Sequence, residues 1–211
     1  MYIPDYYRAE APRKTVDNYP FATLITSGKD GSSATAVPLY FKSDGLDENI
    51  IVGHISAQNP QVENLIDGAS VLAVHTGPHS YISASWYKTP PLIPTWNYLI
   101  AHVRGTIRTQ NSEEEKRSIL LRTAECAEIW NPQPWSLADA APGEVDRLLK
   151  YIYAFEIDVQ SIEGADKLSQ PRTDEDFQRV ITELEKRNLP GDAAVANCMR
   201  QMDRSPTIDT K

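Results

Sequence analysis

The chain has 211 residues, a formal net charge of −8 and an apolar fraction of 41%, so it can bury a sizeable core in one large domain or two small ones. The acidic balance excludes a generally basic nucleic-acid-binding surface, and no apolar run approaches the roughly 20 residues that span a bilayer. The two cysteines are too few for the disulfide framework of a secreted domain, so we expect a cytoplasmic protein.

Strand patterns fill the first two-thirds of the chain. Apolar, partly β-branched segments predict strands over 21–26, 33–41, 50–55, 70–76 and 100–108, with a turn at Asp44-Gly45. Residues 153–159 alternate between apolar and polar side chains, which predicts a half-buried strand. Pro38 lacks the amide donor that a central strand needs, so the 33–41 strand is expected at an edge or with a bulge.

Helix signals are fewer and lie mostly in the second half. Asn59 followed by Pro60 predicts a short helix over 60–66. Ser112 and Glu115 form a capping box at the start of a longer helix, and 144–150 reads as a short one. Thr173 caps an amphipathic helix, and a last helix is expected to end near Met202.

This order of elements is not the regular alternation of strands and helices that is typical of a doubly wound sheet. Several short strands with turns between them favour a largely antiparallel sheet or a small barrel. We expect one domain over 1–164, a C-terminal helical extension packed on the barrel over 165–204, and a disordered tail over 205–211.

The most informative stretch for function is 77–98, which holds two Trp and three Tyr among Ser, Thr, Asn and His. Rigid rings with polar tips suit a flat, partly polar ligand. The alternative is an aromatic-rich loop that caps a core.

A second candidate site is the exit of the predicted 50–55 strand into the helix that follows. Free N–H groups at a helix start attract anions, and His54, Ser56, Gln58 and Asn59 add hydrogen-bonding side chains. An ordinary capped turn is the alternative.

Other chemistry has little support. His75 and His79 have the spacing of helical metal ligands, but the intervening Gly77-Pro78 excludes a helix, so no metal site is predicted. No Walker loop, G-x-G-x-x-G or G-x-S-x-G motif is present, and no catalytic residue is evident.

Several short motifs match one known family in order along the chain. They are Met1-Tyr2-Ile3-Pro4, Val37-Pro38-Leu39, Gly53-His54, Asn59-Pro60-Gln61, Gly77-Pro78-His79 to Ser83, Ser85-Trp86-Tyr87, Pro94-Thr95-Trp96-Asn97-Tyr98, His102-Val103 and Lys167-Leu168-Ser169-Gln170. The set spans about four-fifths of the chain. The sequence therefore resembles the PaiB-type FMN-binding negative transcriptional regulators, a branch of the flavin-binding split-barrel superfamily.

This resemblance implies a mainly β fold, a six-stranded antiparallel split β-barrel with peripheral helices, which pairs as a homodimer and binds FMN. Backbone near Val37, Pro38 and Leu39 would border the isoalloxazine, and the strand exit would hold the phosphate. Trp86 and the Trp96-Asn97 segment would close the pocket. The residues implied for FMN binding are Val37, Pro38, Leu39, Gly53, His54, Ser56, Gln58, Asn59, Gln61, Trp86, Trp96, Asn97 and His102.

Three functions remain open at this point. The first is an FMN-binding regulator, for which the acidic chain and the lack of a helix-turn-helix argue against direct DNA binding. The second is an FMN-dependent oxidoreductase that acts on a small molecule. The third is a flavin-free structural or interaction protein that keeps the barrel.

Overall fold

The computed structural model describes residues 1–29, 31–43 and 49–202, which divide into two compact units. Unit 1 contains Met1–Thr15, Thr76–Ala101 and the chain from Glu163 onward, and unit 2 contains Val16–His75 and His102–Ile162. The predicted Asp44-Gly45 turn and the 205–211 tail lie outside the described residues. The domain boundary at 164 stays a prediction.

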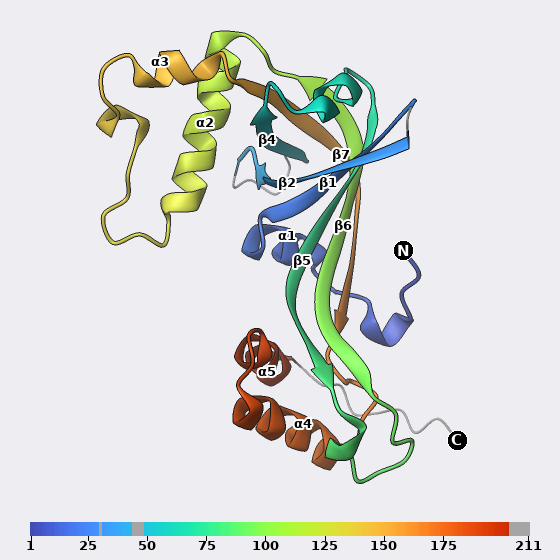
Figure 1. The fold of residues 1–211 in the computed structure, drawn as a ribbon. Coiled ribbons are helices and arrows are strands. Elements are labelled where there is room, and N and C mark those ends of the chain that lie inside the picture. Colours follow the sequence, from blue (N-terminus) through green and yellow to red (C-terminus); the bar gives the residue numbers. More distant parts are fainter. Residues whose placement is uncertain (30, 44–48, 203–211) are drawn as a thin grey trace. The chain divides into compact units, whose positions relative to one another are not determined.

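Unit 2 is built on a sheet of seven strands in the order β2-β1-β5-β6-β7-β4-β3 (Figure 1). The strands are β1 (Phe21–Gly28), β2 (Gly31–Pro38), β3 (Tyr40–Phe41), β4 (Ile50–Ser56), β5 (Ser70–Ile82), β6 (Thr95–Thr109) and β7 (Ile152–Lys167). β1 pairs antiparallel with β2 and β5, and β4 pairs antiparallel with β3 and β7. The sheet is not closed, because β2 and β3 end it. The mainly β, antiparallel prediction is confirmed.

Seven strands are described where six were expected, because the predicted 33–41 strand is split. β2 ends at Pro38, and β3 begins at Tyr40. Between them, the amide of Leu39 donates to the carbonyl of Pro20 at 2.8 Å. Of the two alternatives predicted for this strand, an edge position or a bulge, the edge position is confirmed, because β2 is an end strand of the sheet.

Three strands run further than the sequence suggested. β5 continues to Ile82 through Gly77-Pro78, β6 begins at Thr95, and β7 continues to Lys167. Most of their additional residues belong to unit 1, although residues 160–162 of β7 belong to unit 2. Reading 77–98 as a loop is therefore wrong at both ends, and only the middle, around the 3-10 helix η3 (Ala84–Trp86), connects the two strands.

The prediction of a half-buried β7 is wrong over its first half, since Ala154, Phe155, Glu156 and Ile157 are all buried. Glu156 is only 3% exposed because two cations cover its carboxylate. Lys42 contacts it at 2.9 Å and Arg108 at 3.0 Å. A charge on the polar side of a strand is buried here because it is paired.

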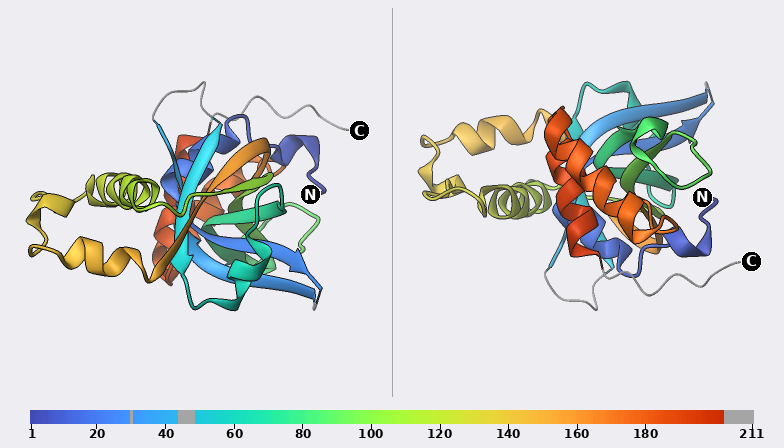
Figure 2. Two further views of the ribbon diagram at one scale, coloured as in Figure 1. Left: turned by 90° about the horizontal axis from the view of Figure 1, so that it is seen from above. Right: turned by 90° about the horizontal axis from the view of Figure 1, so that it is seen from below.

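The helices α2 (Glu113–Glu128) and α3 (Glu144–Leu149) of unit 2 begin where the sequence predicted, whereas η4 (Leu137–Asp139) between them was not predicted. α2 has the Ser112–Glu115 capping box. α2 and α3 lie side by side in both views of Figure 2. The predicted helix at 60–66 is instead a 3-10 helix, η2 (Pro60–Asn64).

Unit 1 is held together by an apolar cluster from its helices and strand ends. α4 (Asp174–Arg187) starts at the Thr173 cap, and α5 (Asp192–Gln201) lies beside it (Figure 2). Ile82, Tyr87, Phe177, Leu184 and Met199 are buried within this cluster. Two short helices complete the described chain, η1 (Asp5–Tyr7) and α1 (Pro12–Asn18).

Candidate functional site

The exit of β4 packs against strand β2 in unit 2. The side-chain amide of Asn59 donates to the hydroxyl of Thr35 at 2.9 Å, and its oxygen accepts the amide of Gln61 at 2.9 Å. Thr35 lies two residues before Val37 in β2. The structure thus brings two of the segments implied for FMN binding into contact, and Thr35 is a polar neighbour that the sequence did not single out.

Gln61 fixes this contact from inside the sheet. It is 2% exposed, and its side-chain amide donates to the carbonyl of Leu24 and to the hydroxyl of Thr26, both at 3.0 Å. A third, longer contact reaches the carbonyl of Ser33 at 3.3 Å. Gln61 therefore positions the segment, because its burial keeps it from an exposed ligand surface.

Gly53 and Leu39 bring β4 close to the split between β2 and β3. A Cβ atom on Gly53 would lie 2.5 Å from the Leu39 Cδ2 atom and 3.1 Å from the Phe155 ring. Only glycine allows this approach. The side chains of Val37 and Leu39 are buried, so a ligand at this place would meet their backbone.

His54 has unused hydrogen-bonding capacity. Its Nδ1 atom is buried and has no hydrogen-bond partner among the described residues. Burial lowers the pKa of the imidazole, so the ring is neutral at pH 7. A neutral ring with an unpartnered nitrogen fits a hydrogen bond to a ligand or a water.

The expected free N–H groups at the start of the 60–66 helix are not found. The amide of Ala57 donates to Tyr151, and that of Asn59 donates to Ser56. The amide of Gln58 donates to the Ser56 hydroxyl at 3.2 Å, and that of Val62 to the carbonyl of Asn59. A phosphate at this place would be held by side chains, since the backbone donors are already used.

His102 lies apart from His54 in unit 2. On one side of β7, Ala154 pairs with His54 of β4. On the side of β6, the carbonyl of Ala154 accepts the amide of Gln110, the residue that follows β6, at 3.0 Å. His102 precedes Gln110 by eight residues, about 26 Å along an extended strand. The two histidines therefore do not lie side by side.

The remaining predicted residues, Trp86, Trp96 and Asn97, belong to unit 1. Asn97 is fully buried, and its side chain exchanges hydrogen bonds with the Ser169 hydroxyl at 3.0 and 3.1 Å. The Trp86 ring lies 4.9 Å from the Arg187 guanidinium. Trp96 is half exposed, with its ring centre 6.0 Å from that of Tyr81. Their role as a cover for the flavin ring stays a prediction.

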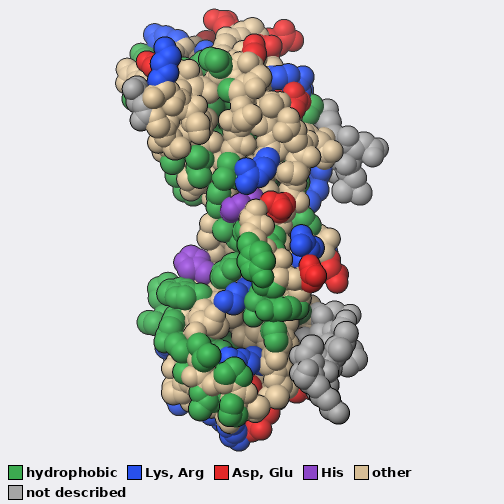
Figure 3. All heavy atoms as spheres, turned by 90° about the vertical axis from the view of Figure 1, so that its right-hand side faces the viewer, with side chains coloured by type: hydrophobic (Ala, Val, Ile, Leu, Met, Phe, Trp, Pro, Cys, Tyr) green, Lys and Arg blue, Asp and Glu red, His purple; other side chains and the backbone are tan. Residues whose placement is uncertain are grey.

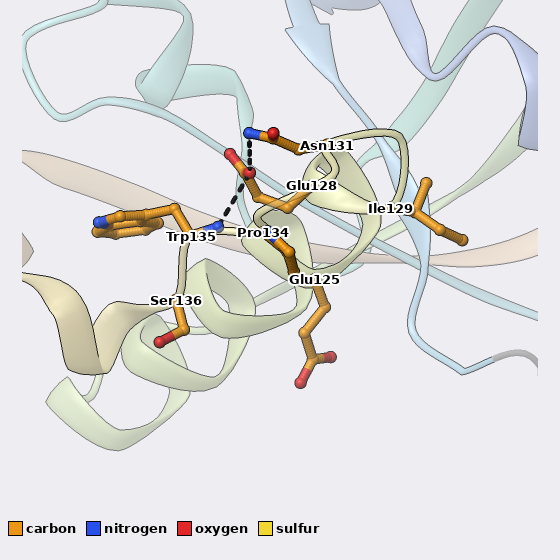
Figure 4. A pocket seen from close by; sticks show the side chains of 7 residues that line it. All are labelled: Glu125, Glu128, Ile129, Asn131, Pro134, Trp135 and Ser136. Atoms are coloured by element: carbon orange, nitrogen blue, oxygen red, sulfur yellow. Dashed lines mark hydrogen bonds between the residues drawn. The ribbon is translucent and has the colours of Figure 1, made fainter.

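Figure 4 shows a different pocket of unit 2, of about 350 Å³, at the end of α2. One carboxylate oxygen of Glu128 accepts the Asn131 side-chain amide at 2.9 Å and the Trp135 backbone amide at 3.1 Å. The Ile129 and Trp135 side chains point to opposite sides in that view. Glu128 thus serves to close the loop after α2.

Within the described residues no group of three or more His, Cys, Asp or Glu side chains could hold a metal ion. Over the same part of the chain, no helix is long and apolar enough to cross a membrane.

Comparison with known proteins decides the family. The model of a family described as "Putative FMN-binding domain" matches residues 1–161. The "protease synthase and sporulation protein PAI 2" of Bacillus subtilis is 34% identical over 204 residues, which cover 94% of this chain and 96% of that protein. The chain belongs to the PaiB-type FMN-binding family. An uncharacterized protein of Emericella nidulans is a more distant relative, 29% identical over 75% of this chain and 76% of its own length.

Solved structures place the PaiB-type fold among the split barrels of flavin proteins. The flavocytochrome Anf3 from Azotobacter vinelandii has a TM-score of 0.61 at 12% identity, covering 84% of this chain and 78% of that chain. An FAD- and haem-binding protein from Mycobacterium smegmatis has a TM-score of 0.55 at 15% identity, covering 82% and 79%. At these identities the likeness concerns the fold alone.

Proposed function

We propose that this PaiB-type protein binds FMN in unit 2, with the phosphate at the β4 exit and the ring along the backbone of Val37–Leu39. The observation that carries the proposal is the contact between Asn59 and Thr35, which holds the β4 exit against β2. The close approach of Gly53 to Leu39 and the unpartnered Nδ1 of His54 support it.

In this proposal each side chain has a binding or positioning role. His54, Ser56 and Gln58 donate hydrogen bonds to the phosphate, and Asn59 orients them by fixing the turn. Gln61 keeps the turn on the sheet. When bound, the flavin supplies the redox chemistry, so the chain needs no acid or base of its own. The segment from His54 to Gln61 contains no Lys or Arg, which favours a modest affinity.

The test is a titration of the full-length protein with FMN, followed by quenching of flavin fluorescence. Loss of one hydrogen bond to a phosphate weakens binding roughly ten- to a hundredfold, and we expect this for His54→Ala. Cys126→Ala, a substitution in α2 of the same unit, should bind as the wild type does. Equal affinity of His54→Ala and wild type, with both folded by circular dichroism, means that the phosphate lies elsewhere.

We further propose that the protein is a homodimer that regulates through its flavin, without binding DNA directly. Over the described residues, β2 and β3 are the end strands of the sheet, and open sheet edges favour a partner. The net charge of −8 disfavours contact with DNA phosphates. Light scattering should give twice the chain mass at micromolar concentration. A monomer at that concentration would contradict the homodimer. A mobility shift that selects one DNA site about a thousandfold over others would contradict the lack of direct DNA binding.

A further inference from the structure

Unit 1 has a pocket of about 460 Å³, within the range of small-molecule sites, and every residue that lines it belongs to this unit. Its walls combine rings and prolines, including Tyr7, Tyr87, Pro91 and Pro94, with the basic side chains of Lys167 and Arg172. In the lower part of Figure 3, hydrophobic side chains gather on the surface, with Lys and Arg side chains between them. None of the residues proposed above for the FMN phosphate lines this pocket, whereas Asn97, which the resemblance implies for FMN binding, does.

Lys167 has no counter-charge among the residues that the structure describes. No carboxylate among the described residues lies within ion-pair distance of its ammonium group, which instead donates to the Thr95 hydroxyl at 2.6 Å. It also lies 5.7 Å from the Tyr7 ring centre and 5.8 Å from that of Tyr98. Burial lowers the pKa of Lys167, which reflects the cost of holding the charge in this place. An anionic ligand would offset that cost.

Arg172, the second basic residue of the lining, is held in a fixed orientation. Its guanidinium stacks 3.8 Å from the Tyr87 ring centre and donates to the carbonyl of Pro91 at 2.7 Å. The acidic residue of the lining, Asp176, already accepts the backbone amide of Lys88 at 2.7 Å and that of Thr89 at 3.1 Å. The pocket thus has two cations and one carboxylate that is already hydrogen-bonded, which favours an anionic ligand.

The tyrosines of the lining add neutral donors. Burial raises the pKa of Tyr7 to about 12 and raises that of Tyr87, so both phenols keep their protons at pH 7. The buried Tyr87 hydroxyl makes no hydrogen bond of normal geometry with a described residue, although Ser169 and Arg172 lie beside it. A buried donor without an acceptor is a further indication of a ligand or water at this place.

We propose that this pocket is a second ligand site, which takes a small flat ring bearing one carboxylate or phosphate group. The ring lies among the tyrosines and prolines, and the anionic group meets Lys167 and Arg172. The pocket goes beyond the FMN site proposed for unit 2, because its lining contains no residue of the β4 exit or of the Val37–Leu39 segment.

The test uses the full-length protein in calorimetric titrations with three ring anions, each compared with an uncharged analogue that we call its neutral twin. The pairs are benzoate and benzamide, nicotinate and nicotinamide, and phenyl phosphate and phenol. We expect at least one anion to bind about tenfold or more tightly than its twin. Lys167→Met should weaken that binding by roughly tenfold or more. Lys150→Met is the matched control, since Lys150 also lies over a tyrosine ring, at 5.1 Å from Tyr151, but in unit 2.

The comparison of anions with neutral twins needs no variant, so it decides even where Lys167→Met fails to fold. The proposal is overturned if no anion binds below a Kd on the order of 10 mM, if the twins bind equally, or if the folded Lys167→Met variant keeps the wild-type affinity. His54→Ala should leave ring-anion binding unchanged whatever it does to FMN. If FMN still displaces the ring anion from His54→Ala, the pocket is part of the flavin site and no second site exists.

Discussion

A buried ion pair in unit 1 gives a prediction whose size follows from the structure. Asp192 is fully buried, and its carboxylate accepts hydrogen bonds from the Ser80 hydroxyl, the Leu189 amide at 2.9 Å and Arg187 at 2.6 and 2.8 Å. Arg187 also donates to the carbonyl of Tyr81 at 2.9 Å. These bonds fasten the end of α4 and the start of α5 to strand β5.

Removal of one partner leaves the other without its counter-charge at a place where Asp192 is fully buried and Arg187 is a quarter exposed. Asp192→Ala or Arg187→Ala should each lower the free energy of unfolding by about 3 kcal/mol. The double variant should lose much less than the sum, with a coupling energy of about 1.5–3 kcal/mol, because both single changes disrupt the same contact. Arg187 is a quarter exposed, so solvent reduces the coupling from the value of a fully buried pair.

The same two helices offer a matched control. Arg200 of α5 pairs with Glu185 of α4, and both side chains are nearly half exposed. Their coupling energy should stay below about 1 kcal/mol. Urea unfolding of both sets, followed by circular dichroism and by tryptophan fluorescence, measures the two cycles. A coupling for Asp192 and Arg187 no larger than that of the exposed pair would refute the reasoning.

Two further predictions concern the same pair and the β4 exit. Hydrogen bonds from Arg187 outweigh burial and lower the pKa of Asp192 to about 2. The protein should therefore lose up to about 2 kcal/mol of unfolding free energy as pH falls from about 4 to about 2, where the carboxylate becomes protonated. Asp192→Asn should remove this pH dependence from acid unfolding curves. Gly53→Ala should lower the free energy of unfolding by about 1–3 kcal/mol, because the new Cβ atom would overlap Leu39. The double variant Gly53→Ala/Leu39→Val should recover part of the loss in melting temperature. An unchanged melting temperature of Gly53→Ala would contradict the close approach of the two residues.

Local signals in the sequence were sufficient for much of the fold. The amide of Ser112 and that of Glu115 are bonded as the capping box predicts, and Asn59 caps η2 as its position before a proline predicts. Pro38 marks the break between β2 and β3. Each of these features depends on residues within a few positions of one another, so the sequence order alone contains the information.

Predictions that depended on neighbours from other strands were less successful. The alternation of β7 suggested an exposed Glu156, because nothing near it in the sequence announces Lys42 or Arg108. Gly77-Pro78 ended the predicted strand, yet β5 continues through it, since pairing within the sheet outweighs the local preference of the two residues. The free amides expected at η2 are used by Ser56 and Tyr151, contacts that a capping rule does not include.

The unit 1 pocket shows why part of a site escapes such reasoning. Tyr7, Tyr87, Lys167 and Arg172 come from the N-terminal segment, the link between β5 and β6, the end of β7 and the turn before α4. Each residue alone is an ordinary aromatic or basic side chain. What makes the group chemically distinctive is that Lys167 lies beside aromatic rings and a hydroxyl, with no carboxylate of the described residues at ion-pair distance. Such a charge is costly in a folded chain unless a ligand compensates it, and that imbalance is visible only after the four segments are brought together.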